Sequence, residues 1–154
     1  MRVKRQHLVK GQIDYEHLSP NTIEIAVPVH LLACSENIVI DSTGVRDLFG
    51  HVKITSEMVK HLKEAYLEAF ADAPTATDAV VDVELYNVTD DALVTKVTYS
   101  GDSGYKVSSD IASSLKELVG KVLCGRFNVT TASGTSGASQ RFRSVILRLV
   151  FGIS

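Results

Sequence analysis

The stretch that most directly decides the fold is residues 79–100, AVVDVELYNVTDDALVTKVTYS. Apolar and polar side chains alternate in its first half and again in its second half, a period of two that is typical of half-buried strands. The segment 87–91, NVTDD, separates the two halves and is rich in turn-forming residues. The stretch therefore predicts a β-hairpin.

Several segments on either side of this hairpin also predict strands. Alternation of apolar residues is loose near the start of the chain and clear over 22–29, TIEIAVPV, where Pro28 cannot donate to a ladder and indicates a sheet edge or strand end. A flexible turn, 134–139, separates the last two predicted strands. The remaining predicted strands are 3–15, 37–41, 127–132 and 141–151.

Two segments show a helical period instead. From 57 to 70 the apolar residues recur at intervals of three and four, which predicts a helix with one buried face. A second apolar stripe predicts a helix over about 109–123, with Gly125 as the residue that ends it. These two helices frame the central hairpin.

The order of these elements predicts one α+β domain over residues 1–154. Its centre is β-α-β-β-α-β, and we expect a two-layer sandwich of the ferredoxin-like plait type, with two helices on one face of a mostly antiparallel sheet. Extra N-terminal strands and an extra C-terminal strand complete the expected fold. Such an architecture alone carries no function.

Charge is distributed unevenly along the chain. Residues 1–10 carry four basic and no acidic side chains, residues 11–100 carry five basic and fifteen acidic ones, and residues 101–154 carry seven basic and three acidic ones. The basic ends could neutralise an anionic partner such as RNA. The residues nominated for that contact are Arg2, Lys4, Arg5, Lys10, Arg126, Arg141 and Arg143.

The last strand is apolar on both faces apart from Arg148. A strand with two apolar faces needs cover on both sides. We expect a contact between subunits here, and the alternative is a central strand covered within one chain. The candidate interface residues are Val145, Leu147, Leu149 and Phe151.

Two short motifs resemble catalytic motifs of proteases but lack the other residues that catalysis would need. The segment 101–104, GDSG, spells the tetrapeptide around the nucleophile of trypsin-like proteases, and 41–44, DSTG, is close to the turn of aspartic proteases. Neither has the supporting groups that such chemistry needs, and both fit polar turns. The histidines show no metal-ligand spacing, and Cys34 and Cys124 are expected to be buried free thiols.

We therefore expect a non-enzymatic, self-assembling structural subunit of the virion, shell or filament type, and a homo-oligomer. The alternative is a small adaptor that binds an anionic partner such as RNA through the basic ends, and a third hypothesis is an enzyme with a site between subunits. No cofactor, small-molecule substrate, membrane span or signal peptide is expected, and location is expected to be intracellular or within an assembled particle.

Overall fold

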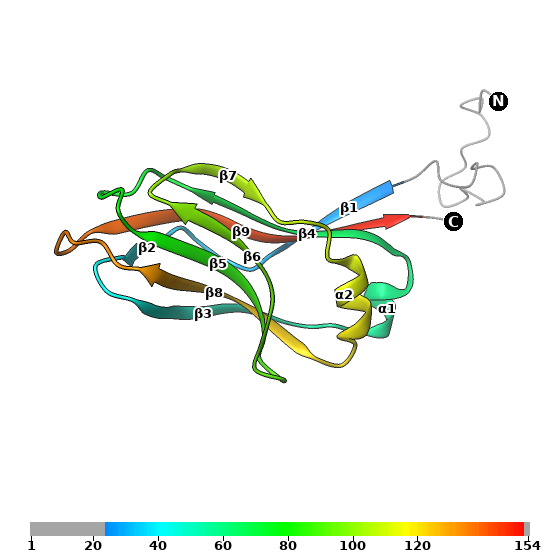
Figure 1. Ribbon diagram of the computed structural model, residues 1–154. Helices are drawn as coiled ribbons and strands as arrows, with labels where there is room; N and C mark the ends of the chain where they lie inside the picture. Colours follow the sequence, from blue (N-terminus) through cyan, green and yellow to red (C-terminus); the bar gives the residue numbers. More distant parts are fainter. Residues whose placement is uncertain (1–23, 153–154) are drawn as a thin grey trace, which may run out of the picture.

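A computed structural model describes residues 24–152 of this chain as a sandwich of two antiparallel β-sheets (Figure 1). Sheet A has the strand order β1-β9-β4-β7, with β2 also paired to β9, and sheet B has the order β3-β8-β5-β6. The strands of sheet A are β1 (Glu24–His30), β2 (Glu36–Val39), β4 (Leu62–Ala71), β7 (Gly104–Val107) and β9 (Ser139–Gly152). Those of sheet B are β3 (Gly44–Lys53), β5 (Val80–Asn87), β6 (Ala92–Ser100) and β8 (Val122–Thr131). Two short helices, α1 (Ser56–Lys60) and α2 (Ala112–Glu117), lie at one end of the sandwich.

The strand pairs are nested along the chain. Strands β1 and β2 pair with the two ends of β9 and together resemble one interrupted strand. In the connection between them, the backbone N–H groups of Leu31 and Leu32 both donate to the carbonyl oxygen of Val145. Working inward along the chain, β3 pairs with β8, β4 with β7, and β5 with β6. This is one long hairpin wrapped into two sheets, which is the jelly-roll arrangement.

The central hairpin is confirmed as β5 and β6. Its inward residues are fully buried, and the Asn87 side chain builds the turn by accepting hydrogen bonds from the backbone of Thr89 and Asp90. The inward residues of the hairpin include Val81, Val83, Leu85, Val97 and Tyr99. Pro28 is confirmed in an edge strand, since β1 ends the order of sheet A.

The prediction of a helix over 57–70 was wrong. Only its first residues are helical, as α1, and most of the segment is strand β4. Alternate side chains of β4, those of Leu67, Ala69 and Ala71, are buried in the core. Pairing with β9 along nearly all of β4 overrides the helical preference of its alanines and leucines.

The second predicted helix is much shorter than expected. Helix α2 ends at Glu117, residues 118–120 form a turn, and strand β8 begins at Val122. Gly125 lies within β8, where the ring of Phe49 packs over it, and does not end a helix. The structure is mostly antiparallel sheet with two small helices, which is consistent with the coarser α+β prediction. The plait is not confirmed, because the helices sit at one end and a second sheet covers the inner face of the first.

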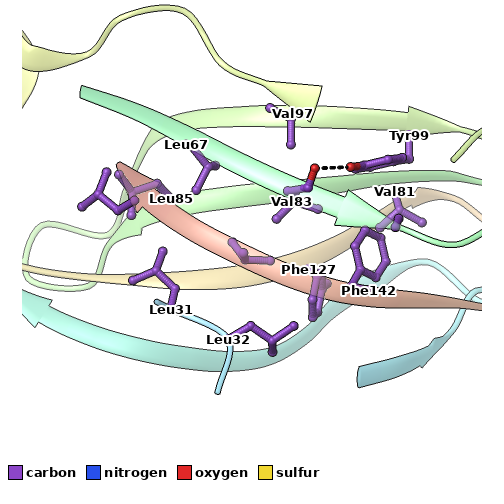
Figure 2. Close-up of a cluster of buried hydrophobic side chains, with 14 of the residues drawn as sticks. Leu31, Leu32, Leu67, Val81, Val83, Leu85, Val97, Tyr99, Phe127 and Phe142 are labelled. Carbon is purple, nitrogen blue, oxygen red and sulfur yellow. Dashed lines mark hydrogen bonds between the residues drawn. The ribbon is translucent and has the colours of Figure 1, made fainter. Parts of the chain in front are cut away.

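Three aromatic rings join the two sheets at the centre of the core. The ring centroid of Phe127 in sheet B lies 4.5 Å from that of Phe142 in sheet A. The ring of Tyr99 packs edge-on against Phe142, with 5.4 Å between the two centroids. Figure 2 shows these rings together with the hydrogen bond of the Tyr99 hydroxyl, which lies 2.9 Å from the carbonyl oxygens of both Ala69 and Gly104. Burial raises the pKa of Tyr99 well above its ordinary value, so the hydroxyl remains a donor. The three rings thereby set the spacing between the two sheets, and the hydrogen bond from Tyr99 to Ala69 connects β6 to β4.

We predict that Gly125→Ala destabilises the fold by about 1–3 kcal/mol, because the new methyl group collides with a packed ring. A Cβ at Gly125 would lie 2.2 Å from a ring carbon of Phe49, whereas one at Gly134 meets nothing closer than 3.5 Å. The free energy of unfolding in urea measures the effect, with Gly134→Ala as the matched control. Equal stability of the two variants would contradict the packing described here, and trimming the ring with Phe49→Leu should reduce the cost of Gly125→Ala.

Candidate interaction surface

The basic residues nominated from the sequence do not come together. Arg2, Lys4, Arg5 and Lys10 lie outside the described residues. Arg126 belongs to β8 in sheet B, while Arg141 and Arg143 lie near the start of β9 in sheet A. Their expected meeting point was a hairpin between the last two strands, but these strands belong to different sheets.

Arg126 belongs to a polar network on the outer face of sheet B. It forms an ion pair with Glu84 and stacks 3.5 Å above the ring of Tyr86. Burial disfavours the charged guanidinium, but the hydrogen bonds and charges of Glu84 and Tyr86 together outweigh this effect, so the pKa of Arg126 is raised. Next to this pair, Asp82 accepts from Lys96 and from the Thr98 hydroxyl, each at 2.6 Å.

Both carboxylates of this network are covered although they lie on an outer face. Asp82 is 2% exposed and Glu84 is 3% exposed, because the long side chains of their cationic partners extend over them. A carboxylate so placed requires its cation, since an unpaired buried charge is strongly unfavourable. The network therefore satisfies itself within one chain and leaves Arg126 little capacity for an outside anion.

Arg143 is also engaged, while Arg141 is free of such a bond. Arg143 pairs with Asp72 at 2.6 Å, and this bond lowers the pKa of the Asp72 carboxyl below its ordinary value. Arg141 is exposed, and no ion pair joins it to another described residue, although its charge also acts on Asp72. In the described part of the chain, Arg141 is thus the one nominated cation that remains unbonded.

The proposed interface residues of the last strand lie mainly in the core. Val145, Leu147 and Leu149 are buried between the sheets, and Phe151 is half-buried against the same core. One chain is therefore enough to cover them, which was the alternative considered for this strand. A contact formed by β9 with another molecule has to use the opposite face, which carries Ile146 and Arg148.

That opposite face belongs to the outer surface of sheet A, which is aromatic and apolar. Arg148 forms an ion pair with Glu68 at its centre and lies 4.8 Å above the ring of Tyr66. Phe70 on β4 stands directly opposite Tyr105 on β7, and Val107 stands opposite Glu68. The exposed fractions of Phe70, Tyr105 and Val107 are 41%, 58% and 41%. Tyrosine, phenylalanine and arginine are enriched in protein interfaces, so this face has the composition of one.

The sequence analysis missed these residues. Tyr66 and Phe70 fell in the apolar stripe of the helix predicted over 57–70, and Tyr105 was interpreted as a core or strand-surface residue without a role in binding. The signal that could have found them is the alternation in β4, where the outward residues Tyr66, Glu68 and Phe70 alternate with buried inward residues such as Leu67 and Ala69. This alternation was not recognised because the apolar residues of the same segment also recur with a helical period.

Two other exposed apolar pairs lie on different sides of the sandwich. Ile25 and Val27 extend from β1, one edge strand of sheet A, and Val45 and Leu48 lie on β3, an edge strand of sheet B. The outer face near β7 is at the opposite edge of sheet A from β1. The described residues therefore present apolar side chains on at least three separate surfaces.

The motifs with catalytic associations are structural turns. Gly101 has a φ of +71° and its Cα approaches Thr77 so closely that a Cβ would lie 2.0 Å from the Thr77 carbonyl oxygen. Asp102 accepts from the backbone of Ser100 and from Lys106, and Asp41 accepts from the backbone of Gly137 at 2.7 Å. Each aspartate fixes a loop, as expected from the sequence.

The two cysteines differ in environment. Cys124 is a buried free thiol as predicted, and burial raises its pKa. Cys34 is also a free thiol, but it is exposed, so the prediction of burial was wrong there. It lies in the connection between β1 and β2, where the strand is interrupted and the apolar neighbours Leu31 and Leu32 take the buried positions.

Neither a protein-family model nor a curated protein matches this sequence. Over residues 24–152, no group of three or more His, Cys, Asp or Glu side chains is placed to hold a metal ion. In the same range, neither helix has the length and apolar character needed to cross a membrane.

We predict that Arg126→Ala lowers the free energy of unfolding by about 3 kcal/mol, because it leaves the covered Glu84 carboxylate without its cation. The matched control is Arg143→Ala, which breaks an exposed pair and should cost less than about 1 kcal/mol. The double variant Arg126→Met with Glu84→Leu should regain most of the loss. Urea denaturation at neutral pH measures all three, and equal effects of the two single variants would contradict the burial of the network.

Proposed function

We propose that this chain is a non-enzymatic structural subunit that assembles with copies of itself into a shell or filament, such as a virion. The observation that carries the proposal is the presence of separate exposed apolar areas on β1, on β3 and on the outer face of sheet A. A subunit in an extended or closed assembly needs several contact surfaces, since each copy touches several neighbours. Contacts between unlike surfaces build rings or lattices.

The strand topology supports this proposal by analogy. Jelly rolls are found in viral capsid proteins, lectins and cupins. A fold does not determine a function, so the analogy only raises the weight of an assembly role. The exposed apolar areas add an independent reason, because contiguous apolar patches on a protein surface often mark interaction sites.

We expect the purified chain to form a species much heavier than its 16.7 kDa monomer. The measurement is size-exclusion chromatography with light scattering at low and at high salt. Because apolar contacts survive high salt whereas charge contacts weaken, the assembly should persist at high salt. A clean monomer at both salt concentrations would contradict the proposal.

Variants of one apolar area separate assembly from folding. Ile25→Lys with Val27→Lys should lower the assembled mass, because both side chains are exposed and their replacement does not empty the core. Leu93→Lys, at a similarly exposed apolar position on β6, serves as the control and should assemble like the unaltered chain. Thermal unfolding of each variant shows whether the fold is retained.

A second candidate function is binding of an anionic polymer such as RNA through the basic N-terminal segment. The observation in its favour is the contrast in charge. Residues 24–152 carry twelve basic and sixteen acidic side chains, whereas residues 1–10 carry four basic ones and no acid. Since Arg126 and Arg143 are engaged in ion pairs, this proposal rests on the N-terminal segment, where the sequence places four basic residues within ten.

We predict that the full chain binds a random-sequence single-stranded oligonucleotide with an affinity that falls as salt rises. Four contacts to phosphates give a slope of about −3 in a plot of log affinity against log salt concentration. Replacing Arg2, Lys4, Arg5 and Lys10 by Gln should remove most of that slope, while Arg141→Gln should change it little. Absence of measurable affinity at about 50 mM salt would rule this function out.

A further inference from the structure

The outer face of sheet A is built from residues that stand opposite one another on neighbouring strands. One row contains Phe70 and Tyr105, and the next contains Ile146, Glu68 and Val107. Because Glu68 is tied to Arg148 and nearly covered, the centre of the face offers one ion pair that is already satisfied, surrounded by rings and aliphatic groups. Such a face can lose water at a small electrostatic cost, as the core of an interface must.

The two ends of this face carry opposite charge. One end, near the start of β9, holds Arg141, Arg143 and Asp72, a net charge of +1. The other end, where β1 begins and β4 leaves α1, holds the Glu24–Lys63 pair together with two further acids that act on Tyr66, for a net charge of −2. Those two acids are Glu64, which accepts from the Tyr66 hydroxyl at 3.1 Å, and Asp110.

A face with a neutral apolar centre and oppositely charged ends is complementary to itself when one copy is reversed. Placing two copies face to face with their strands antiparallel sets the basic end of each copy over the acidic end of the other. Placing the strands parallel sets like charges against each other, which is unfavourable. A two-fold contact of this kind uses the same patch on both subunits.

We infer that the outer face of sheet A is a two-fold contact between copies of this chain, packed face to face with antiparallel strands around Tyr66, Phe70, Tyr105 and Ile146. The inference rests on the proposed function and names one of its contact surfaces. The outer surface of sheet B also exposes apolar residues, Val45 and Leu48 on β3 and Leu93 on β6, but its centre is occupied by the charged network of Asp82, Glu84 and Arg126.

The first experiment truncates the aromatic centre in the full chain. Tyr105→Ser and Phe70→Ser should each raise the dissociation constant for self-association at least about ten-fold, measured by sedimentation velocity over a concentration series. Leu93→Ser and Val119→Ser remove exposed apolar groups elsewhere and should change it less than about two-fold. All four residues are exposed, and a melting curve for each variant confirms that it folds.

The second experiment tests the orientation by charge reversal. Arg141→Glu and Glu64→Lys should each weaken association, and the double variant should restore it toward the original value at low salt. Loss in both single variants without recovery in the double variant would overturn the antiparallel arrangement.

The outcomes also separate this inference from the proposed function. If the chain assembles and the Tyr105 and Phe70 variants assemble equally well, the contact lies elsewhere, so the inference fails while the proposed function stands. A chain that stays monomeric at every concentration and salt tested overturns both.

Discussion

The pairing of β9 with three other strands is the constraint on which the rest of the structure depends. Its fourteen residues hold β4 on one side and both β1 and β2 on the other. Its inward side chains, Phe142 among them, meet the aromatic residues of sheet B, so the same strand organises the sheet and the core. Since β1 and β9 are far apart in sequence, this pairing closes the longest loop of the domain and forms only when most of the chain is available.

The two outer faces of the sandwich have different chemistry, and this difference carries the functional argument. On sheet B the carboxylates of Asp82 and Glu84 are matched by cations of the same chain. On sheet A a single matched pair is surrounded by aromatic and aliphatic groups that remain exposed. At the free edge of sheet A, Pro28 has no N–H with which to extend the ladder. Pro28 therefore disfavours the addition of a further strand at this edge.

Local patterns predicted the parts of the fold that local interactions determine. The hairpin of β5 and β6 was predicted correctly because alternation and an asparagine turn act over short distances. The last strand was also found, with bounds close to those of β9. The second sheet was missed because β4 was taken for a helix, and its assignment depends on a partner about 80 residues away in the sequence. When β4 is predicted as a helix, the outward positions of Tyr66 and Phe70 on a strand are not recognised, and the aromatic face is missed as well.

The nominated cations do not meet for a similar reason, since the sequence proximity of Arg126 and Arg141 does not reveal that they belong to different sheets.

The way in which sheet A is assembled determines when its outer face forms during folding. Its outer face takes rows of side chains from β1, β4, β7 and β9, which are spread over the whole described chain. A folding intermediate that lacks β9 has neither Ile146 nor the Arg148 that neutralises Glu68, so its exposed surface carries an unmatched acid where the finished face is neutral. Because of the nested order of strands, a chain presents this apolar and charge-matched face only after it has completed its own fold.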